Sequence, residues 1–250
     1  MNSGRTAWTV AQAPQRGYRA VLFDLDGVLT PTADVHMAAW KRLFTDYFTA
    51  HGVTPPYTDD DYFASIDGKP RYDGVRTCLA SRGITLDEGQ PDDATTSQTV
   101  CGLGNRKNEL FTAVLRQDGV VAYPGSVALL DHLKSAHVAV AVVSSSRNAA
   151  MVLEAAGLSD RFDVVVSGVE AAQQHLRGKP APDTYAYAAQ LLGVPVDEAV
   201  VVEDAISGVA AGAAGSFGLV IGVDRGAGEA DLRRHGADVV VSDLQELVQG

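Results

Sequence analysis

The feature that most constrains the fold of this chain is an alternation, from about residue 124 onward, of short apolar runs with helical patterns. Nearly continuous apolar strands are typical of parallel sheets, which are covered by helices on both faces. We therefore predict an α/β fold with a doubly wound parallel sheet. Two helices end at glycine, where a left-handed cap is expected. The strands are expected at 138–143, 162–168, 199–204, 219–223 and 237–243, with helices that include 126–136, 148–157 and 182–193.

The first part of the chain follows a different pattern. Residues 21–26 (VLFDLD) have the character of another buried strand, but no comparable run follows between 33 and 115. Large apolar side chains recur instead at helical spacing over 40–48, which predicts a helical insertion after the first strand. The polar stretch 87–98 is expected to be a surface loop. The predicted division is a flexible leader at 1–17, a core formed by 18–32 and 116–250, and the helical insertion at 33–115.

Charge and cysteine content exclude several classes of function. The formal net charge is -11 and the isoelectric point is near 4.9, so nucleic acid and anionic membranes would be repelled at long range. Cys78 and Cys101 form no CxxC pair, which favours two reduced thiols and a cytoplasmic setting. No run approaches the length of a membrane span, and no signal peptide is recognisable.

Polar side chains collect where the predicted strands end. Asp24 and Asp26 follow the first strand, Ser144 and its neighbours follow the second, and Glu203-Asp204 end the fourth. Each has an ordinary structural role when taken singly, as a turn former or a helix cap. Because the carboxyl ends of parallel strands meet at one edge of a sheet, we expect these groups to converge there, together with Lys179.

The converging residue types indicate phosphate chemistry assisted by a metal. Several carboxylates in one crevice suit a hard cation such as Mg²⁺, and the lack of a His/Cys cluster argues against zinc. Ser144 and Lys179 are then expected to bind a transferring phosphoryl group. One aspartate would attack phosphorus while the other moves a proton. Two nucleotide-binding motifs are excluded, because 102–107 (GLGNRK) and Gly178-Lys179 each lack a required glycine.

Four segments then resemble the motifs of a known family. FDLDGVLT, VVSSS, GKPAPD and VVEDAISGVAAG are similar, in order, to the four motifs of the haloacid dehalogenase superfamily, and the resemblance covers residues from about 18 to 225. It implies a Rossmann-like core. In the insertion, VHMAAWKRLF, DGKPR and NRKNEL resemble the helical cap of β-phosphoglucomutases and their sugar-phosphatase relatives.

The resemblance implies roles for the core residues. Asp24 would be the nucleophile that becomes an aspartyl-phosphate, and Asp26 the general acid and base. Gly27 would let the chain turn sharply beside them. The implied metal ligands are Asp24, Asp26 through its backbone carbonyl, Glu203 and Asp204, and the implied ligands of the transferring phosphate are Ser144 and Lys179.

It also implies roles for residues around the substrate. Arg71 would clamp a second, non-transferring phosphate. His36 and Lys107 would couple cap closure to Asp26. The remaining implied contacts are Gly68 and Lys69 in the loop that closes over the substrate, and Ser146, Arg147 and Asn148 around the second phosphate.

By this resemblance the chain is a Mg²⁺-dependent enzyme that interconverts β-D-glucose 1-phosphate and glucose 6-phosphate through a bisphosphorylated intermediate. A leaving alkoxide needs a proton and a halide does not, so Asp26 favours phosphate chemistry over dehalogenation. The alternatives are a sugar-phosphate phosphatase on the same scaffold and a non-enzymatic phosphometabolite-binding module. Pro31 and Asp67 depart from the usual family pattern, so the identity of the sugar stays open. A small phosphorylated sugar is the expected partner, and a monomer is expected.

Overall fold

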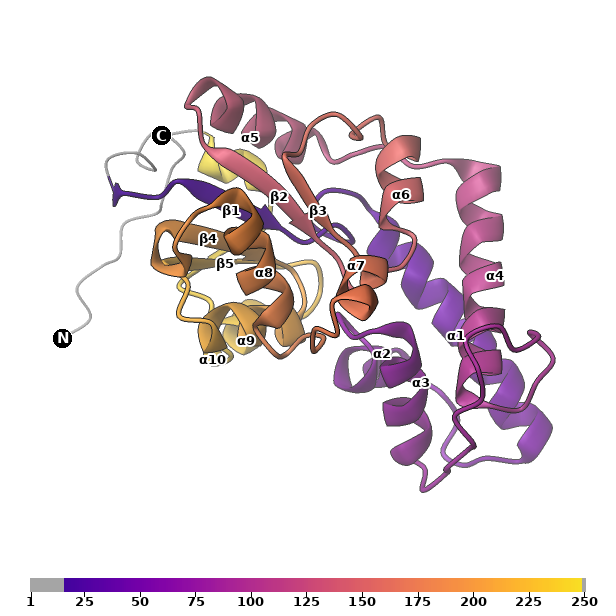
Figure 1. The fold of residues 1–250 in the computed structure, drawn as a ribbon. Coiled ribbons are helices and arrows are strands. Elements are labelled where there is room, and N and C mark those ends of the chain that lie inside the picture. Colours follow the sequence, from indigo (N-terminus) through magenta and orange to yellow (C-terminus); the bar gives the residue numbers. More distant parts are fainter. Residues whose placement is uncertain (1–15, 249–250) are drawn as a thin grey trace.

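The computed structural model describes residues 16–248, and in this part of the chain six parallel strands form one sheet (Figure 1). The strand order is β3-β2-β1-β4-β5-β6, so β1 lies in the middle with β2 and β4 on either side. The predicted doubly wound parallel sheet is therefore confirmed. The strands are β1 (Ala20–Phe23), β2 (Ala139–Val143), β3 (Val164–Val166), β4 (Ala199–Glu203), β5 (Leu219–Val223) and β6 (Val239–Val241).

Alternate residues of β1 pack against helices on opposite faces of the sheet. Val21 and Phe23 join an apolar cluster with α5 and α6, whereas Ala20 and Leu22 join a second cluster with α8. Burial of such side chains contributes roughly 1.5–3 kcal/mol each for the larger ones. The helices of this part are α5 (Pro124–Ser135), α6 (Ala149–Ala155), α7 (Gly168–Gln173), α8 (Asp183–Leu192), α9 (Ile206–Ala214) and α10 (Glu229–Arg234), with short 3-10 helices at Val196–Glu198 and Leu244–Leu247.

The predicted helix ends agree with the structure. Gly157 lies two residues beyond α6 and Gly193 directly follows α8, and both have φ of 67°. That left-handed conformation costs glycine little, which is why the sequence pattern locates both ends.

The helical insertion, residues 33–115, contains helices and no strand. Its helices are α1 (Thr32–His51), α2 (Asp59–Ser65), α3 (Arg71–Ala80) and α4 (Val100–Asp118). They enclose their own apolar cluster, separate from the clusters around the sheet. The loop predicted at 87–98 has no regular element, as expected. Because α4 extends to Asp118, the helices run slightly past the predicted bounds, and the division into domains stays a prediction. The aromatic and aliphatic residues that predicted α1 are all buried: Trp40, Leu43, Phe44, Tyr47 and Phe48.

Three further expectations concern the chain as a whole. Cys78 and Cys101 are free thiols, as predicted, and both are buried. Across residues 16–248, the helices are too short or too polar to cross a membrane. Residues 1–15 of the predicted leader lie outside the described part of the chain.

Candidate active site

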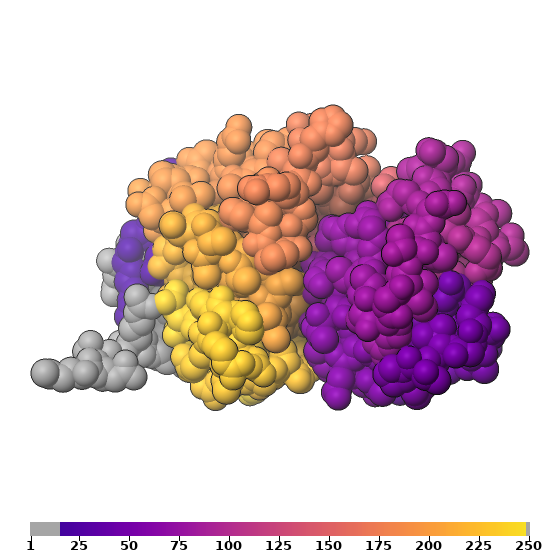
Figure 2. Space-filling view, turned by 90° about the horizontal axis from the view of Figure 1, so that it is seen from below, coloured from indigo at the N-terminus to yellow at the C-terminus, as the bar shows by residue number. Residues whose placement is uncertain are grey.

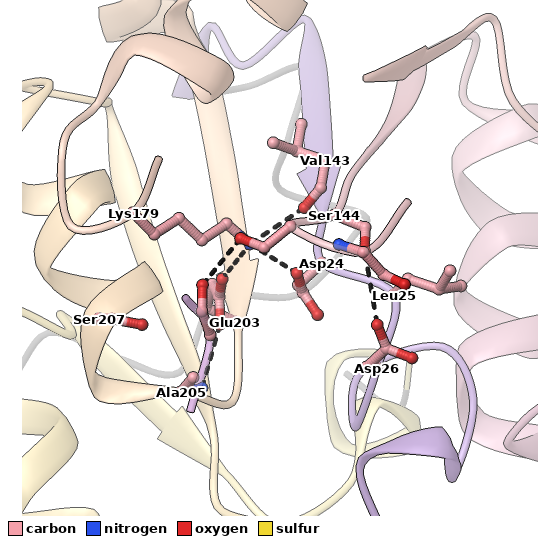
Figure 3. A network of polar contacts seen from close by, with 12 residues as sticks. Asp24, Leu25, Asp26, Val143, Ser144, Lys179, Glu203, Ala205 and Ser207 are labelled. Atoms are coloured by element: carbon pink, nitrogen blue, oxygen red, sulfur yellow. Dashed lines mark hydrogen bonds and ion pairs between the residues drawn. The ribbon is translucent and has the colours of Figure 1, made fainter. Parts of the chain in front are cut away.

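Carboxylates gather at the edge of the sheet where β1 and β4 end side by side, among them Asp24, Asp26 and Glu203 (Figure 3). Asp24 follows the last residue of β1, Glu203 is the last residue of β4, and Asp204 follows it. These three buried residues offer carboxylate oxygens that lie within 4.8 Å of one another. Asp26 is on the same edge, but its carboxylate is not a member of this group. The predicted convergence of acidic residues is therefore present.

Lys179 lies in the middle of this acidic group. Its Nζ donates to Asp24 Oδ1 at 2.5 Å, to Glu203 Oε1 at 2.5 Å and to the Val143 carbonyl at 3.0 Å, as Figure 3 shows. Glu203 is fixed further, because Oε1 accepts from the Tyr185 hydroxyl at 3.0 Å. A buried ammonium with three acceptors is satisfied and holds the ends of three strands, β1, β2 and β4, in one geometry.

The charges of this group do not balance. Burial raises the pKa of Asp24 and of Asp204 well above the usual value, and neighbouring carboxylates raise both pKa values further, while Lys179 acts in the opposite direction. Burial alone would lower the pKa of Lys179, but Asp24 and Glu203 together raise it. One ammonium thus faces several carboxylates. A second cation would relieve the remaining repulsion, and a donor set made of carboxylate oxygens fits a hard divalent ion.

Gly27 makes this crowding possible. Its φ is +87°, and a Cβ at this position would lie 1.9 Å from Asp204 Oδ2. Any other residue would both strain the backbone and displace the carboxylate of Asp204. The sharp turn predicted at Gly27 is therefore present.

The carboxylate of Asp26 is held by groups from both the core and the helical insertion. Thr32 donates to Oδ1, and His36 Nε2 lies 3.4 Å from the same oxygen. Lys107 contacts Nδ1 of His36 from the other side. Ser144 Oγ donates to Oδ2 at a long 3.4 Å. A chain of polar contacts therefore links α4, through α1, to the loop after β1.

This chain of contacts favours an ionised Asp26. Burial would raise the pKa of Asp26, but His36, Thr32 and Lys107 together lower it. Burial also lowers the pKa of His36, and it lowers that of Lys107 well below its usual value. If Lys107 donates to Nδ1, a neutral His36 ring carries its proton on Nε2, which faces the Asp26 carboxylate.

A second polar cluster spans the helical insertion and the core. Arg71 Nη2 donates to Asn108 Oδ1 at 2.8 Å, and Asn148 Nδ2 donates to the same oxygen at 2.7 Å. The backbone N–H of Asn148 also donates to Ser146 Oγ at 3.1 Å. Arg147 lies on the same cavity wall. Two guanidinium groups and two amides form a site suited to an anion.

One cavity of about 70 Å³ joins the two clusters. Its acidic end includes Asp67, where the resemblance leads one to expect lysine, and burial together with the nearby Glu203 raises the pKa of Asp67 to about 7. Three predicted site residues are buried outside the cavity lining. Ser144 contacts Asp26, Lys179 contacts Asp24, and Glu203 contacts Lys179. The other predicted site residues line the cavity: Asp24, Asp26, His36, Gly68, Lys69, Arg71, Lys107, Ser146, Arg147, Asn148 and Asp204.

The sequence did not identify three residues that the geometry brings into the site. Asn108 follows Lys107 and bridges Arg71 to the core. Ser145, expected at this edge with Ser144 and Ser146 but given no role of its own, also lines the cavity. Tyr62 and Tyr185 carry no signal in the sequence, because each belongs to the buried face of a helix.

The fold and the site together define an α/β enzyme core with a carboxylate cluster at the carboxyl edge of its sheet. The family model of haloacid dehalogenase-like hydrolases matches residues 18–215. A β-phosphoglucomutase of Mycobacterium bovis is 49% identical over 239 residues, which cover 92% of this chain and 91% of that protein. A β-phosphoglucomutase of Bacillus subtilis is 31% identical, covering 92% and 91%.

A solved structure of a Clostridium difficile β-phosphoglucomutase has the same fold, with a TM-score of 0.74, 24% identity, and coverage of 93% of this chain and 94% of that one. The chain therefore belongs to the haloacid dehalogenase-like hydrolase family, in the branch that contains the β-phosphoglucomutases.

Proposed function

We propose that this enzyme interconverts β-D-glucose 1-phosphate and glucose 6-phosphate through a bisphosphorylated sugar. The observation that carries the proposal is one cavity with two different ends. Asp24 lies at one end, and Arg71 and Arg147 lie at the other. A sugar that carries two phosphates, one to be transferred and one to be held, needs such a pair of sites.

Magnesium is the proposed cofactor. Asp24, Glu203 and Asp204 would hold it through carboxylate oxygens, with the backbone carbonyl of Asp26 as a further ligand. When bound, the metal would neutralise negative charge on the transferring phosphoryl group. The surplus of carboxylates over ammonium groups at this edge supports a divalent cation there.

The chain's own residues would perform the transfer as follows. A carboxylate oxygen of Asp24 attacks phosphorus, and the bond from phosphorus to the sugar oxygen breaks. Lys179, already 2.5 Å from Asp24, favours the ionised form of the nucleophile and would neutralise phosphate charge. Ser144 donates a hydrogen bond to the same phosphate.

Asp26 would move the proton. An ionised Asp26 can take the proton from the sugar hydroxyl that attacks the phosphorylated Asp24, and the protonated form can return it to a leaving oxygen. Thr32 and His36 orient its carboxylate for both steps. Lys107 supports His36 from α4.

The helical insertion would act as a cap that covers the substrate. Arg71 would clamp the second phosphate, assisted by Asn108, which its guanidinium already contacts. The remaining proposed contacts are Gly68 and Lys69 from the cap, and Ser146, Arg147 and Asn148 from the core. The proposed division keeps 18–32 and 116–250 as core and 33–115 as cap, and the proposed enzyme is a cytoplasmic monomer.

The second candidate is a sugar-phosphate phosphatase. The matched family is one of hydrolases, and the cavity has room for roughly five water molecules beside Asp24. In a phosphatase, water instead of a sugar hydroxyl would attack phosphorus, and inorganic phosphate would leave Asp24.

One assay separates the two candidates. The enzyme receives β-glucose 1-phosphate, Mg²⁺ and a trace of the bisphosphate, and glucose 6-phosphate and inorganic phosphate are followed separately. Glucose 6-phosphate as the main product supports the mutase, whereas phosphate release without isomerisation refutes it in favour of the phosphatase. Asp24→Asn should abolish both activities, and a non-enzymatic binding module predicts no effect of that change.

A further inference from the structure

The loop between α2 and α3 contacts the core at consecutive backbone carbonyls. Ser145 Oγ donates to the carbonyl of Gly68 at 2.8 Å, and Ser207 Oγ donates to the carbonyl of Asp67 at 2.9 Å. Both serines belong to the core, and both carbonyls belong to the cap. We propose that these two hydroxyls form a latch that sets how phosphorylated Asp24 divides its phosphoryl group between a sugar hydroxyl and water.

The position of the latch in the sheet supports this role. Ser145 follows β2, and Ser207 lies in the first turn of α9, after β4. Strands β2 and β4 flank β1, and Asp24 follows β1. The two hydrogen bonds therefore anchor the loop on both sides of the nucleophile. Figure 2 shows the cap and the core in contact along an extended seam.

The contact is too close to be a loose encounter of two surfaces. A Cβ on Gly68 would lie 2.2 Å from Ser207 Oγ and 3.0 Å from Ala205 Cβ. A Cβ on Gly178 would lie 2.4 Å from Cγ of Pro70, two residues along the same loop. The loop is thus packed against core side chains at Gly68 and against the core backbone at Gly178, which leaves no gap for water between it and the core there.

The chemical consequence rests on the proposed function. In the productive step, a sugar hydroxyl oxygen bonds to phosphorus, the bond from phosphorus to the Asp24 carboxylate breaks, and the hydroxyl proton passes to Asp26. Water can replace the sugar hydroxyl in the same step, and inorganic phosphate is then released. Sugar exchange requires the cap to move away from the core, because residues of both parts line the cavity that would hold the sugar. The fraction of time that the cap is open therefore governs how much of the phosphoryl group on Asp24 is lost to water.

Each hydrogen bond of the latch joins a neutral hydroxyl to a neutral carbonyl. Bonds of that kind shift a two-state equilibrium about fivefold. Ser145→Ala and Ser207→Ala should each raise the ratio of inorganic phosphate to glucose 6-phosphate about fivefold, and the double variant should raise it about twenty-fivefold. These serines are positioning residues, since neither is assigned a contact with the reacting atoms.

The test combines a product ratio with a measurement that needs no activity. Spin labels at Thr45→Cys on α1 and Gln190→Cys on α8, both exposed positions, report the distance between cap and core by pulsed electron paramagnetic resonance. Ser135→Ala is the matched control, because the Ser135 hydroxyl bonds within its own helix. We expect a longer and broader distance distribution together with a higher phosphate ratio in the double variant, and neither change in the control.

The possible outcomes decide the proposal separately from the proposed function. An unchanged distance distribution in the double variant overturns the latch, whether or not the enzyme isomerises sugar phosphates. If the distance distribution changes but the product ratio does not, the latch exists but does not set how the phosphoryl group divides between sugar and water, and that part of the proposal is overturned. If the wild-type enzyme releases phosphate and forms no glucose 6-phosphate, the mutase proposal fails, and the latch then predicts a shift of phosphatase KM in the double variant, whose absence overturns it.

Discussion

Replacing Lys179 by methionine tests the electrostatic account of the site. Lys179 is 3% exposed and contacts Asp24 and Glu203 at 2.5 Å each. With an effective dielectric constant of about 20, each contact corresponds to an attraction of about 7 kcal/mol, much of which is offset by the cost of burying the charges. Removing one partner of such a group typically costs about 3–5 kcal/mol, because the other charges stay buried.

We therefore expect Lys179→Met to lower the melting temperature in EDTA by about 10 °C. Mg²⁺ should restore a larger part of stability in this variant than it adds to the wild type, because the metal would then be the main positive charge between Asp24, Glu203 and Asp204. Activity should fall by at least about a hundredfold with metal present. Thermal unfolding with and without Mg²⁺, alongside the coupled product assay, measures both effects.

Lys134→Met is the matched control, because Lys134 is exposed on α5 and far along the chain from the acidic group. The reasoning is refuted if Lys179→Met unfolds in EDTA at the wild-type temperature, or if Mg²⁺ stabilises both proteins equally. The double change Lys179→Met/Glu203→Gln should recover part of the stability, since it removes one buried charge of each sign.

The same carboxylates give the metal-free protein a pH dependence. Their folded pKa values are raised above the ordinary 3.8, so the folded state binds protons more tightly than the unfolded state. The stability that Asp24 and Asp204 contribute in this way is present below about pH 4 and is lost as pH rises through the folded pKa values. Melting temperatures in EDTA should fall over that range, and Mg²⁺ should abolish the fall.

Three further predictions concern the cap. Arg71→Met should lower kcat/KM for β-glucose 1-phosphate about a hundredfold while leaving hydrolysis of a small aryl phosphate nearly unchanged, because only the sugar phosphate reaches that end of the cavity; equal losses on both substrates would contradict this role. His36→Phe keeps a ring that can stack on Phe111 but removes the group that lowers the pKa of Asp26. The acidic limb of the pH–rate profile should therefore move to higher pH. An unmoved limb would contradict the proposed effect of His36 on Asp26. Asp61→Asn should destabilise the protein by about 2 kcal/mol in denaturant titration, because Asp61 accepts two short hydrogen bonds from Arg82. The interaction with Arg82 lowers the pKa of Asp61. The wild type should therefore lose this stability as pH falls below about 4, and the variant should show no such loss.

The strands could be predicted because parallel strands buried on both faces leave a signal in the sequence itself. The edge that carries the site could be predicted for a similar reason, since Asp24, Ser144 and Glu203 each come at a strand end and such ends meet whatever the strand order. Lys179 comes from a loop, and it could be expected at the same edge because that loop follows the third predicted strand of the core.

The missed residues depend on how separate parts of the chain pack together. Asn108 reaches the core because α4 lies where Arg71 and Asn148 can share its carbonyl oxygen, and helical periodicity gives no sign of this. Tyr185 looks like any buried aromatic residue of an amphipathic helix until its hydroxyl is found on Glu203. Contacts of this kind are set by tertiary structure and have no local signature.

The central position of β1 has a consequence for the order in which the protein takes shape during synthesis. The apolar cluster of the cap closes among side chains between Trp40 and Leu103, so it can form while the ribosome is still making the rest of the chain. Strand β1 must meanwhile wait for both of its neighbours, and Asp24 waits for Lys179, 155 residues downstream. A nascent chain can therefore complete the cap well before the nucleophile acquires its counter-charge, so the catalytic edge is assembled after the cap that covers it.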